Sequence, residues 1–167
     1  MSLLGVRVEV PTNQPIVLLR EERGARYLPI FIGAPEATAI AYALQGVETP
    51  RPMTHDLFTT VLDELGAVLE QVEITGLEDG TFFAELVLRH GDDVIRLSAR
   101  PSDALALAVR QVLPVPIVAA EAVVDEAGVI YEADDEPEVL GGATGDAPDL
   151  EEFHEFIEHV RPEDFLD

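Results

Sequence analysis

The amino-acid sequence predicts an α+β fold: a single compact domain in which a mixed, largely antiparallel sheet is packed by three helices, followed by an acidic C-terminal helix. Three observations lead to this prediction. Strand-like segments are grouped in threes along the chain, helical patterns stand between and after these groups, and acidic residues dominate residues 117–167. Grouped strands favour antiparallel pairing over the regular strand-helix alternation of a parallel sheet.

Three strands are expected before Gly33. The segment GVRVEV at 5–10 alternates apolar and polar residues, as a half-buried strand does. The segments IVLLR at 16–20 and YLPIFI at 27–32 flank the polar turn EERGA, which predicts a hairpin. Pro29 lacks a backbone N–H and therefore favours an edge position or a bulge.

Two helices should follow this hairpin. The segment APEATAIAYALQG has Pro35 in its first turn and Gly46 after its end, which are typical helix-boundary residues. Its apolar residues at helical spacing are Ala37, Ile40, Ala41 and Leu44. The segment THDLFTTVLDELG predicts a second helix, with Thr54 as the N-cap and Gly66 as the C-terminal stop. One apolar stripe runs along it, made of Leu57, Phe58, Val61, Leu62 and Leu65.

A meander of three strands is expected next, at 68–77, 81–90 and 93–99, joined by the turns EDG and GDD. The segment ARPSDALALAVR at 99–110 then predicts a helix. Because it is apolar on every face from Ala104 to Val109, this helix should be central and covered on both sides. The segment VPIVAAEAVV at 115–124 predicts a strand that runs into a short helix or turn.

These elements place the folded domain at residues 1–131. Residues 132–149 combine Gly, Pro and acidic residues with few large apolar groups, which predicts an acidic flexible linker. Residues 150–167 predict an amphipathic helix whose stripe is Leu150, Phe153, Ile157 and Val160. That stripe should dock on this domain, on another subunit or on a protein partner.

Charge is distributed unevenly along the 167 residues, whose net charge is −23. Residues 1–116 hold 9 basic and 16 acidic residues (9 − 16 = −7), whereas residues 117–167 hold 1 and 17 (1 − 17 = −16). Salt screens exposed charges beyond about 8 Å. A local arginine site within residues 1–116 is therefore compatible with the negative net charge of the whole chain. The chain has no cysteine, no basic leader and no apolar run of about 18 residues, so we expect a cytoplasmic protein without a membrane span.

Several catalytic motifs can be excluded. No Gly-rich phosphate loop follows a strand, no G-x-S-x-G elbow occurs, and no thiol nucleophile exists. The segment HEFIEH at 154–159 is similar to a zinc-protease helix. Its two histidines are five residues apart and so diverge by about 140° around a helix, which prevents them from chelating one ion.

A set of polar residues at three helix starts remains. Glu36, Asp56 and Asp103 each stand in a first helical turn, where a carboxylate stabilises exposed N–H groups and the helix dipole. On the helical wheel Asp56 lies opposite the apolar stripe of its helix, whereas Glu36 and His55 lie at stripe boundaries, where residues can line a cleft. A metal-assisted phosphodiesterase needs carboxylates for Mg²⁺ or Mn²⁺, a base and arginines for the phosphate.

The segments YLPIFIGAPEATAIAYAL, RPMTHDLFTTVLDELG, VEITGLEDGTFFAELVL and ARPSDALALAVR, in this order, resemble the bifunctional nuclease domain family of bacteria and plants, over about residues 3–125. The resemblance implies an α+β domain, homo-oligomerisation as a dimer or trimer, and cleavage of DNA and RNA. By motif match the family's residues fall on Glu36, Arg51, Thr54, His55, Asp56, Arg100, Ser102 and Asp103. One departure is Ser98, which stands where the family often has an aspartate before the Arg-Pro pair.

Two functional hypotheses stay open at this point. In the first, the protein is a nuclease that cleaves DNA or RNA with Mg²⁺ or Mn²⁺ as cofactor. Its catalytic residues are then Glu36, His55, Asp56 and Asp103. Arg51 and Arg100 bind the phosphate, and Thr54 and Ser102 cap helices. In the second, the protein is a non-catalytic, oligomeric binding or regulatory domain whose Arg-Asp motifs are structural.

Overall fold

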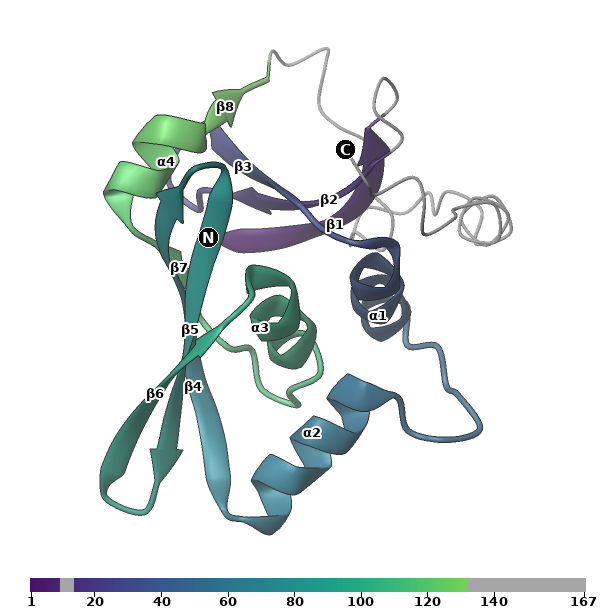
Figure 1. Ribbon diagram of the computed structural model, residues 1–167. Coiled ribbons are helices and arrows are strands. Elements are labelled where there is room, and N and C mark those ends of the chain that lie inside the picture. The colour runs from purple at the N-terminus through teal and green to yellow at the C-terminus, as the bar shows by residue number, and fades with distance from the viewer. Residues whose placement is uncertain (10–13, 132–167) are drawn as a thin grey trace.

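The computed structural model describes residues 1–9 and 14–131 (Figure 1). The linker predicted at 132–149 and the helix predicted at 150–167 lie outside the described residues, so both stay predictions. Two sheets and four helices make up the described part, which confirms the α+β class. No described helix is both long and apolar enough to cross a membrane.

The first sheet consists of β1 (Ser2–Glu9), β2 (Gln14–Arg20), β3 (Arg26–Phe31) and β8 (Val129–Ile130), in that order and antiparallel throughout. The predicted hairpin around EERGA is confirmed as β2–β3. Strand β8 pairs only with Arg26 and Tyr27, so Pro29 lies in a stretch of β3 that β8 does not reach. Its missing N–H therefore interrupts no ladder on that side.

The second sheet consists of β4 (Ala67–Glu78), β5 (Thr81–His90), β6 (Asp93–Ala99) and β7 (Ile117–Ala119), in the order β6-β5-β4-β7. The predicted meander is confirmed, and β7 adds the one parallel pairing of this sheet. The β4–β5 turn has Asp79 at φ 49° and Gly80 at φ 78°, which suits the Asp-Gly dipeptide.

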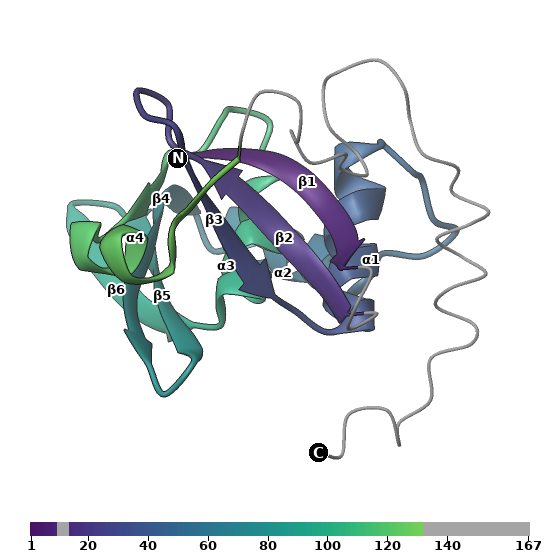
Figure 2. The same ribbon diagram turned by 90° about the horizontal axis from the view of Figure 1, so that it is seen from above.

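The division into two sheets is a difference from the single sheet that we expected. Each group of three strands pairs locally, and the two groups are separated in the chain by α1 (Ala34–Leu44) and α2 (Thr54–Glu64). Figure 2 shows the two sheets as separate layers with the helices beside them. Arg26 of β3 forms ion pairs with Glu121 and Asp125 of α4 (Glu121–Ala127), the helix between β7 and β8.

Helix α3 (Pro101–Ala108) occupies the centre of the domain, as its apolar composition predicted. All of its residues except Asp103 are buried. It contacts α1, α2, β4 and β5, so it is covered on several sides (Figure 1). The segment after β7 forms α4, which confirms a helix where the sequence left a helix or a turn open, and which brings the number of packed helices to four.

The predicted apolar stripe of helix α2 is mostly exposed. Of its predicted apolar stripe, Leu62 alone is buried, while the other four side chains are 41–65% exposed. The helix lies at one end of the domain and touches α3 and β4 along a narrow side. Its stripe is thus wider than the surface that covers it.

Candidate functional site

The starts of α1, α2 and α3 form the candidate site. Each helix is preceded by a residue in extended conformation, which is Gly33 for α1, Met53 for α2 and Arg100 for α3. Thr54 and Ser102, which we predicted as caps, are instead the first residue of α2 and the second residue of α3. The residues at the N-cap positions are Gly33, Met53 and Arg100, and none of their side chains forms a capping hydrogen bond.

Arg100 connects α1 and α3. Its Nε donates to Asp103 Oδ2 at 2.7 Å and its Nη2 donates to Asp103 Oδ1 at 3.0 Å. Its Nη1 lies 2.8 Å from Glu36 Oε1. A cation at a helix start opposes the dipole, and these two carboxylates are the compensating partners. They raise the pKa of Arg100, the hydrogen bond with Asp103 most strongly, so the guanidinium stays charged.

His55 connects α2 to the same pair. Its Nε2 lies 3.1 Å from Asp103 Oδ1, and its side chain is 15% exposed. The hydrogen bond from Arg100 is the largest cause that lowers the pKa of Asp103, and the contact with His55 adds to it against the opposing effect of burial. Asp103 is therefore an ionised acceptor that two partners share.

Asp56 lies outside this cluster. Its Oδ1 accepts from Arg110 Nε at 2.6 Å, and its Oδ2 accepts from the Met53 N–H at 2.8 Å. Burial raises the pKa of Asp56, but the two hydrogen bonds outweigh burial and the pKa is lowered. Arg110, 8% exposed, also donates to the carbonyls of Ala106 and Ala39. Asp56 is thus engaged in holding α2 to α3 and α1.

Arg110 is a residue of this region that the predicted site did not include. It stands seven positions after Asp103 and past the end of α3, and the carboxylate that it contacts is Asp56. Arg51, predicted to bind phosphate, is exposed, and its carbonyl accepts a hydrogen bond from Thr49 Oγ1. None of the contacts described for the cluster involves the Arg51 side chain.

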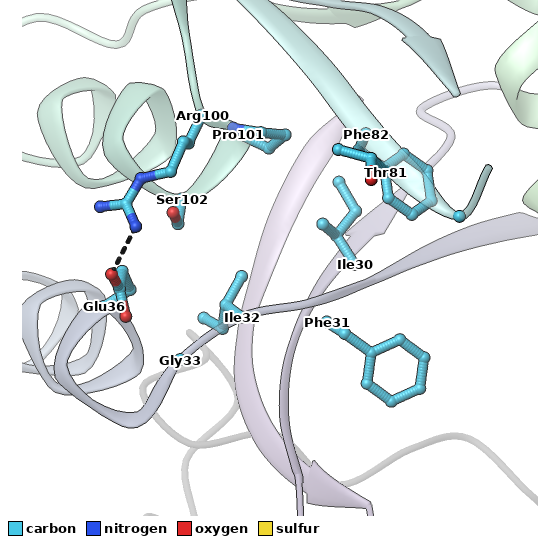
Figure 3. A pocket seen from close by; sticks show the side chains of 11 residues that line it. Ile30, Phe31, Ile32, Gly33, Glu36, Thr81, Phe82, Arg100, Pro101 and Ser102 are labelled. Carbon is cyan, nitrogen blue, oxygen red and sulfur yellow. Dashed lines mark ion pairs between the residues drawn. The ribbon is translucent and has the colours of Figure 1, made fainter. Parts of the chain in front are cut away.

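Two pockets share the Arg100–Glu36 ion pair as a wall. The histidine pocket has a volume of about 280 Å³ and is lined by Pro35, Glu36, Ala39, Met53, Thr54, His55, Arg100 and Asp103. The phenylalanine pocket has a volume of about 300 Å³ and is lined by Ile30, Phe31, Ile32, Gly33, Glu36, Gly80, Thr81, Phe82, Arg100, Pro101 and Ser102. Figure 3 shows the phenylalanine pocket, with Arg100 reaching toward Glu36 on one side and Phe82 on the other side.

The cluster as arranged does not fit a divalent metal ion. Within residues 1–9 and 14–131, no three His, Asp or Glu side chains are grouped so that they could hold one. The guanidinium of Arg100 contacts the carboxylates of both Glu36 and Asp103, which are the donors that Mg²⁺ or Mn²⁺ would need.

Comparison of the sequence with known proteins shows the family of this chain. Residues 17–132 match the model of the bifunctional nuclease domain. An uncharacterized protein of Mycobacterium tuberculosis is 47% identical over 165 residues, which cover 99% of this chain and 96% of that protein. Bifunctional nuclease 2 of Oryza sativa subsp. japonica is 30% identical over 117 residues, 68% of this chain and 36% of the plant protein. Bifunctional nuclease 2 of Arabidopsis thaliana is 30% identical over 108 residues, 63% of this chain and 33% of that protein. The chain therefore belongs to the bifunctional nuclease domain family.

Proposed function

We propose that the protein cleaves phosphodiester bonds of nucleic acid at the cluster formed by His55, Arg100, Asp103 and Glu36. The observation that carries the proposal is the contact of Asp103 with both His55 and Arg100 beside an open pocket. The names of the plant relatives agree with it, although this chain spans only about a third of their length.

His55 is the candidate for proton transfer. A neutral imidazole has one N–H and one lone pair, and the partner of one nitrogen fixes the role of the other. If Nε2–H donates to the ionised Asp103, Nδ1 becomes the basic nitrogen that takes a proton from the attacking water. The water oxygen then bonds to phosphorus while the bond from phosphorus to the leaving oxygen breaks, and the leaving oxygen takes a proton from solvent. Asp103 also stabilises the imidazolium that forms in this step.

Arg100 is the candidate for binding the phosphate. Its guanidinium has five N–H donors, and three contacts with carboxylates account for only part of them. The side chain is 65% exposed, so the remaining donors are within reach of a phosphate from solvent. Planar donor pairs of this kind suit phosphate oxygens.

The phenylalanine pocket is the candidate for binding a base. Phe31 is 51% exposed at its rim and Phe82 lines it, so a nucleobase could stack there while its phosphate contacts Arg100. Stacking requires an unpaired base, which favours single-stranded substrate.

A second candidate function is a non-catalytic binding or regulatory domain. It is favoured by the Asp56–Arg110 pair, in which a buried arginine joins three helices and lines neither of the two pockets described above. If the Arg100–Asp103 pair likewise serves only to hold helices together, the cluster stabilises the fold and has no catalytic role.

Cleavage of labelled single-stranded RNA and DNA at low salt distinguishes the two functions. The proposal predicts cleavage by the wild type and its loss in Asp103→Asn, while Asp92→Asn, in an exposed turn, retains it. Assays with Mg²⁺, with Mn²⁺ and with EDTA show whether a metal ion takes part. A folded wild type that cleaves neither substrate under any of these conditions would contradict the proposal and favour the second function.

A further inference from the structure

Neither the fold nor the proposed cleavage accounts for the hydroxyl of Ser102. Ser102 is the second residue of α3, and only 6% of its surface is exposed. In the part of the chain that the structure describes, no other serine, threonine, amide or charged residue is buried to this extent. A polar group so far from water normally has a hydrogen-bond partner inside the protein.

Other hydroxyls in the helices do have such partners. Three helical threonines donate to the carbonyl four residues earlier, and these are Thr38, Thr59 and Thr60. For Ser102 the residue four positions earlier is Ser98 of β6, before the helix begins, so this bond is not available. Arg100 occupies the N-cap position, so Ser102 does not cap α3 either. Within residues 1–9 and 14–131 the Ser102 side chain makes no hydrogen bond.

The Ser102 hydroxyl reaches the phenylalanine pocket. Ser102 is one of the residues that line this pocket, and Figure 3 shows it beside the Arg100–Glu36 ion pair. Among the described residues, fully enclosed side-chain polar atoms without a partner occur at Arg7 and Gln45. The Ser102 oxygen is not one of them, so part of its surface stays open to the pocket. Because an unpaired hydroxyl in apolar surroundings costs free energy, a ligand that supplies the missing partner gains from binding here.

The walls of the phenylalanine pocket suit a flat ring that has a polar edge. Ile30 and Phe82 form an apolar wall, and Phe31 is half exposed at the rim. Figure 3 shows Ser102 and Arg100 on the side opposite Phe82. A ring bound between these walls has apolar side chains along its faces and the hydroxyl at its edge. Nucleobases of single strands combine these two properties, because they stack on aromatic side chains and carry hydrogen-bonding groups at their edges.

The charges around the two pockets favour a base over a phosphate as the partner of Ser102. The charged residues that line the phenylalanine pocket are Glu36 and Arg100, and their charges cancel. This pocket therefore has no excess positive charge that would attract a phosphate. His55 lines the histidine pocket instead, so a phosphate that is cleaved beside His55 lies on that side of Arg100. The neighbouring base is then on the Ser102 side.

We propose that Ser102 binds substrate, with its hydroxyl hydrogen-bonded to the edge of an unpaired base in the phenylalanine pocket. This inference rests on the proposed function, because it takes single-stranded nucleic acid as the substrate. A hydroxyl donates one hydrogen bond and accepts others, so it matches the donors and acceptors of all four bases. The base edge is free in a single strand and is occupied by pairing in a duplex. Ser102 therefore selects unpaired bases without reading a sequence.

Binding of a short labelled single strand to Ser102→Ala, followed by fluorescence anisotropy, tests this proposal. The variant should fold, because alanine is a better helix former than serine and the lost hydroxyl makes no bond within the described chain. We expect the dissociation constant to rise about 3-fold to 10-fold, which corresponds to the loss of one hydrogen bond. Ser98→Ala is the matched control, since Ser98 is exposed and lines neither of the two pockets. Electrophoresis verifies that the strand stays intact during the titration.

A modified strand separates the hydrogen bond from stacking. In a set of otherwise identical strands, a phenyl ring replaces the base at one position after another. The phenyl ring stacks on aromatic side chains but has no hydrogen-bonding edge. At the position that enters the pocket, we expect wild type and Ser102→Ala to bind the phenyl strand with equal affinity. Phe31→Ala should still bind this strand more weakly than wild type does, because stacking is retained.

Three results would overturn the inference about Ser102. They are a wild type that binds no single strand, a Ser102→Ala variant that binds the natural strand as tightly as wild type does, and a loss of affinity that persists at every phenyl position. Because binding is measured apart from cleavage, the two proposals fail separately. A Ser102 effect that the phenyl ring removes supports base binding even in a protein that cleaves nothing. Unchanged binding by Ser102→Ala contradicts base recognition by Ser102 even in an active nuclease.

Discussion

His55 and Asp103 lie 48 positions apart in the sequence and meet at 3.1 Å between Nε2 and Oδ1. Each stands in the first turn of its helix, so the contact joins the starts of α2 and α3. Arg100 then extends the connection to Glu36 at the start of α1. Three helix starts that could have been independent caps thus form one cluster.

Acid should weaken the contribution of Asp103 to stability. The folded state lowers its pKa, mainly through Arg100, below an unfolded value of about 4. A lowered pKa adds stability that is present above the unfolded pKa and is lost as the pH falls through the folded pKa. Denaturant unfolding should therefore show a smaller difference between wild type and Asp103→Asn at pH 3 than at pH 7. A difference that is unchanged between these pH values would contradict the shift.

Arg110→Met should destabilise the protein by about 1–3 kcal/mol, because Asp56 loses its arginine partner. The carbonyls of Ala106 and Ala39 also lose the hydrogen bonds that Arg110 donates to them. The free energy of unfolding from urea titration measures this loss. Arg51→Met is the control, since Arg51 is exposed. Equal stabilities of the two variants would show that the Arg110 contacts add nothing.

Phe31→Ala should weaken binding of a short single-stranded oligonucleotide by about 5-fold to 150-fold, which corresponds to about 1–3 kcal/mol for one stacked base. Fluorescence anisotropy with a labelled strand gives the dissociation constant. Phe83→Ala is a suitable control, because Phe83 is also exposed but does not line the pocket. Equal weakening by both changes would refute a specific role for the phenylalanine pocket.

Gly80→Ala should lower the free energy of unfolding by about 1 kcal/mol. Gly80 has φ 78°, and an added Cβ would meet no neighbouring atom, so the cost lies in the backbone conformation alone. Gly76 also has open space around it but lacks a positive φ, so Gly76→Ala should be nearly neutral by comparison. Thermal and urea unfolding of the pair check this difference.

Local pattern was enough to predict most elements. Helical spacing with Gly46 and Gly66 predicted α1 and α2, and the Asp79–Gly80 turn predicted the β4–β5 hairpin. The single-sheet expectation was wrong because strand pairing between distant groups is not encoded in local alternation. The exposure of most of the α2 stripe could not be predicted for a related reason, since periodicity shows that a face is apolar but not what covers it.

The sequence pointed to polar residues at three helix starts, but it did not predict which of them meet or that Asp56 lies outside their cluster. His55 and Glu36, at stripe boundaries on the helical wheel, line the histidine pocket, whereas Asp56, opposite its stripe, does not. Arg100 stands at a helix start, where a cation opposes the dipole, and Asp103 and Glu36 are its carboxylate partners. The partner of Asp56 could not be predicted, because Arg110 reaches it across 54 positions of sequence.

The proposed proton transfer by His55 is the central functional claim, and a comparison of two histidines tests it directly. Single-turnover cleavage of a fluorescent RNA would be measured for wild type, His55→Ala and His90→Ala, with folding checked by circular dichroism. His90 lies exposed at the end of β5, away from the pockets. General acid–base catalysis contributes about 100-fold to 10,000-fold, so we predict a rate loss in that range for His55→Ala and an unchanged rate for His90→Ala. Equal rates for wild type and folded His55→Ala would contradict the account.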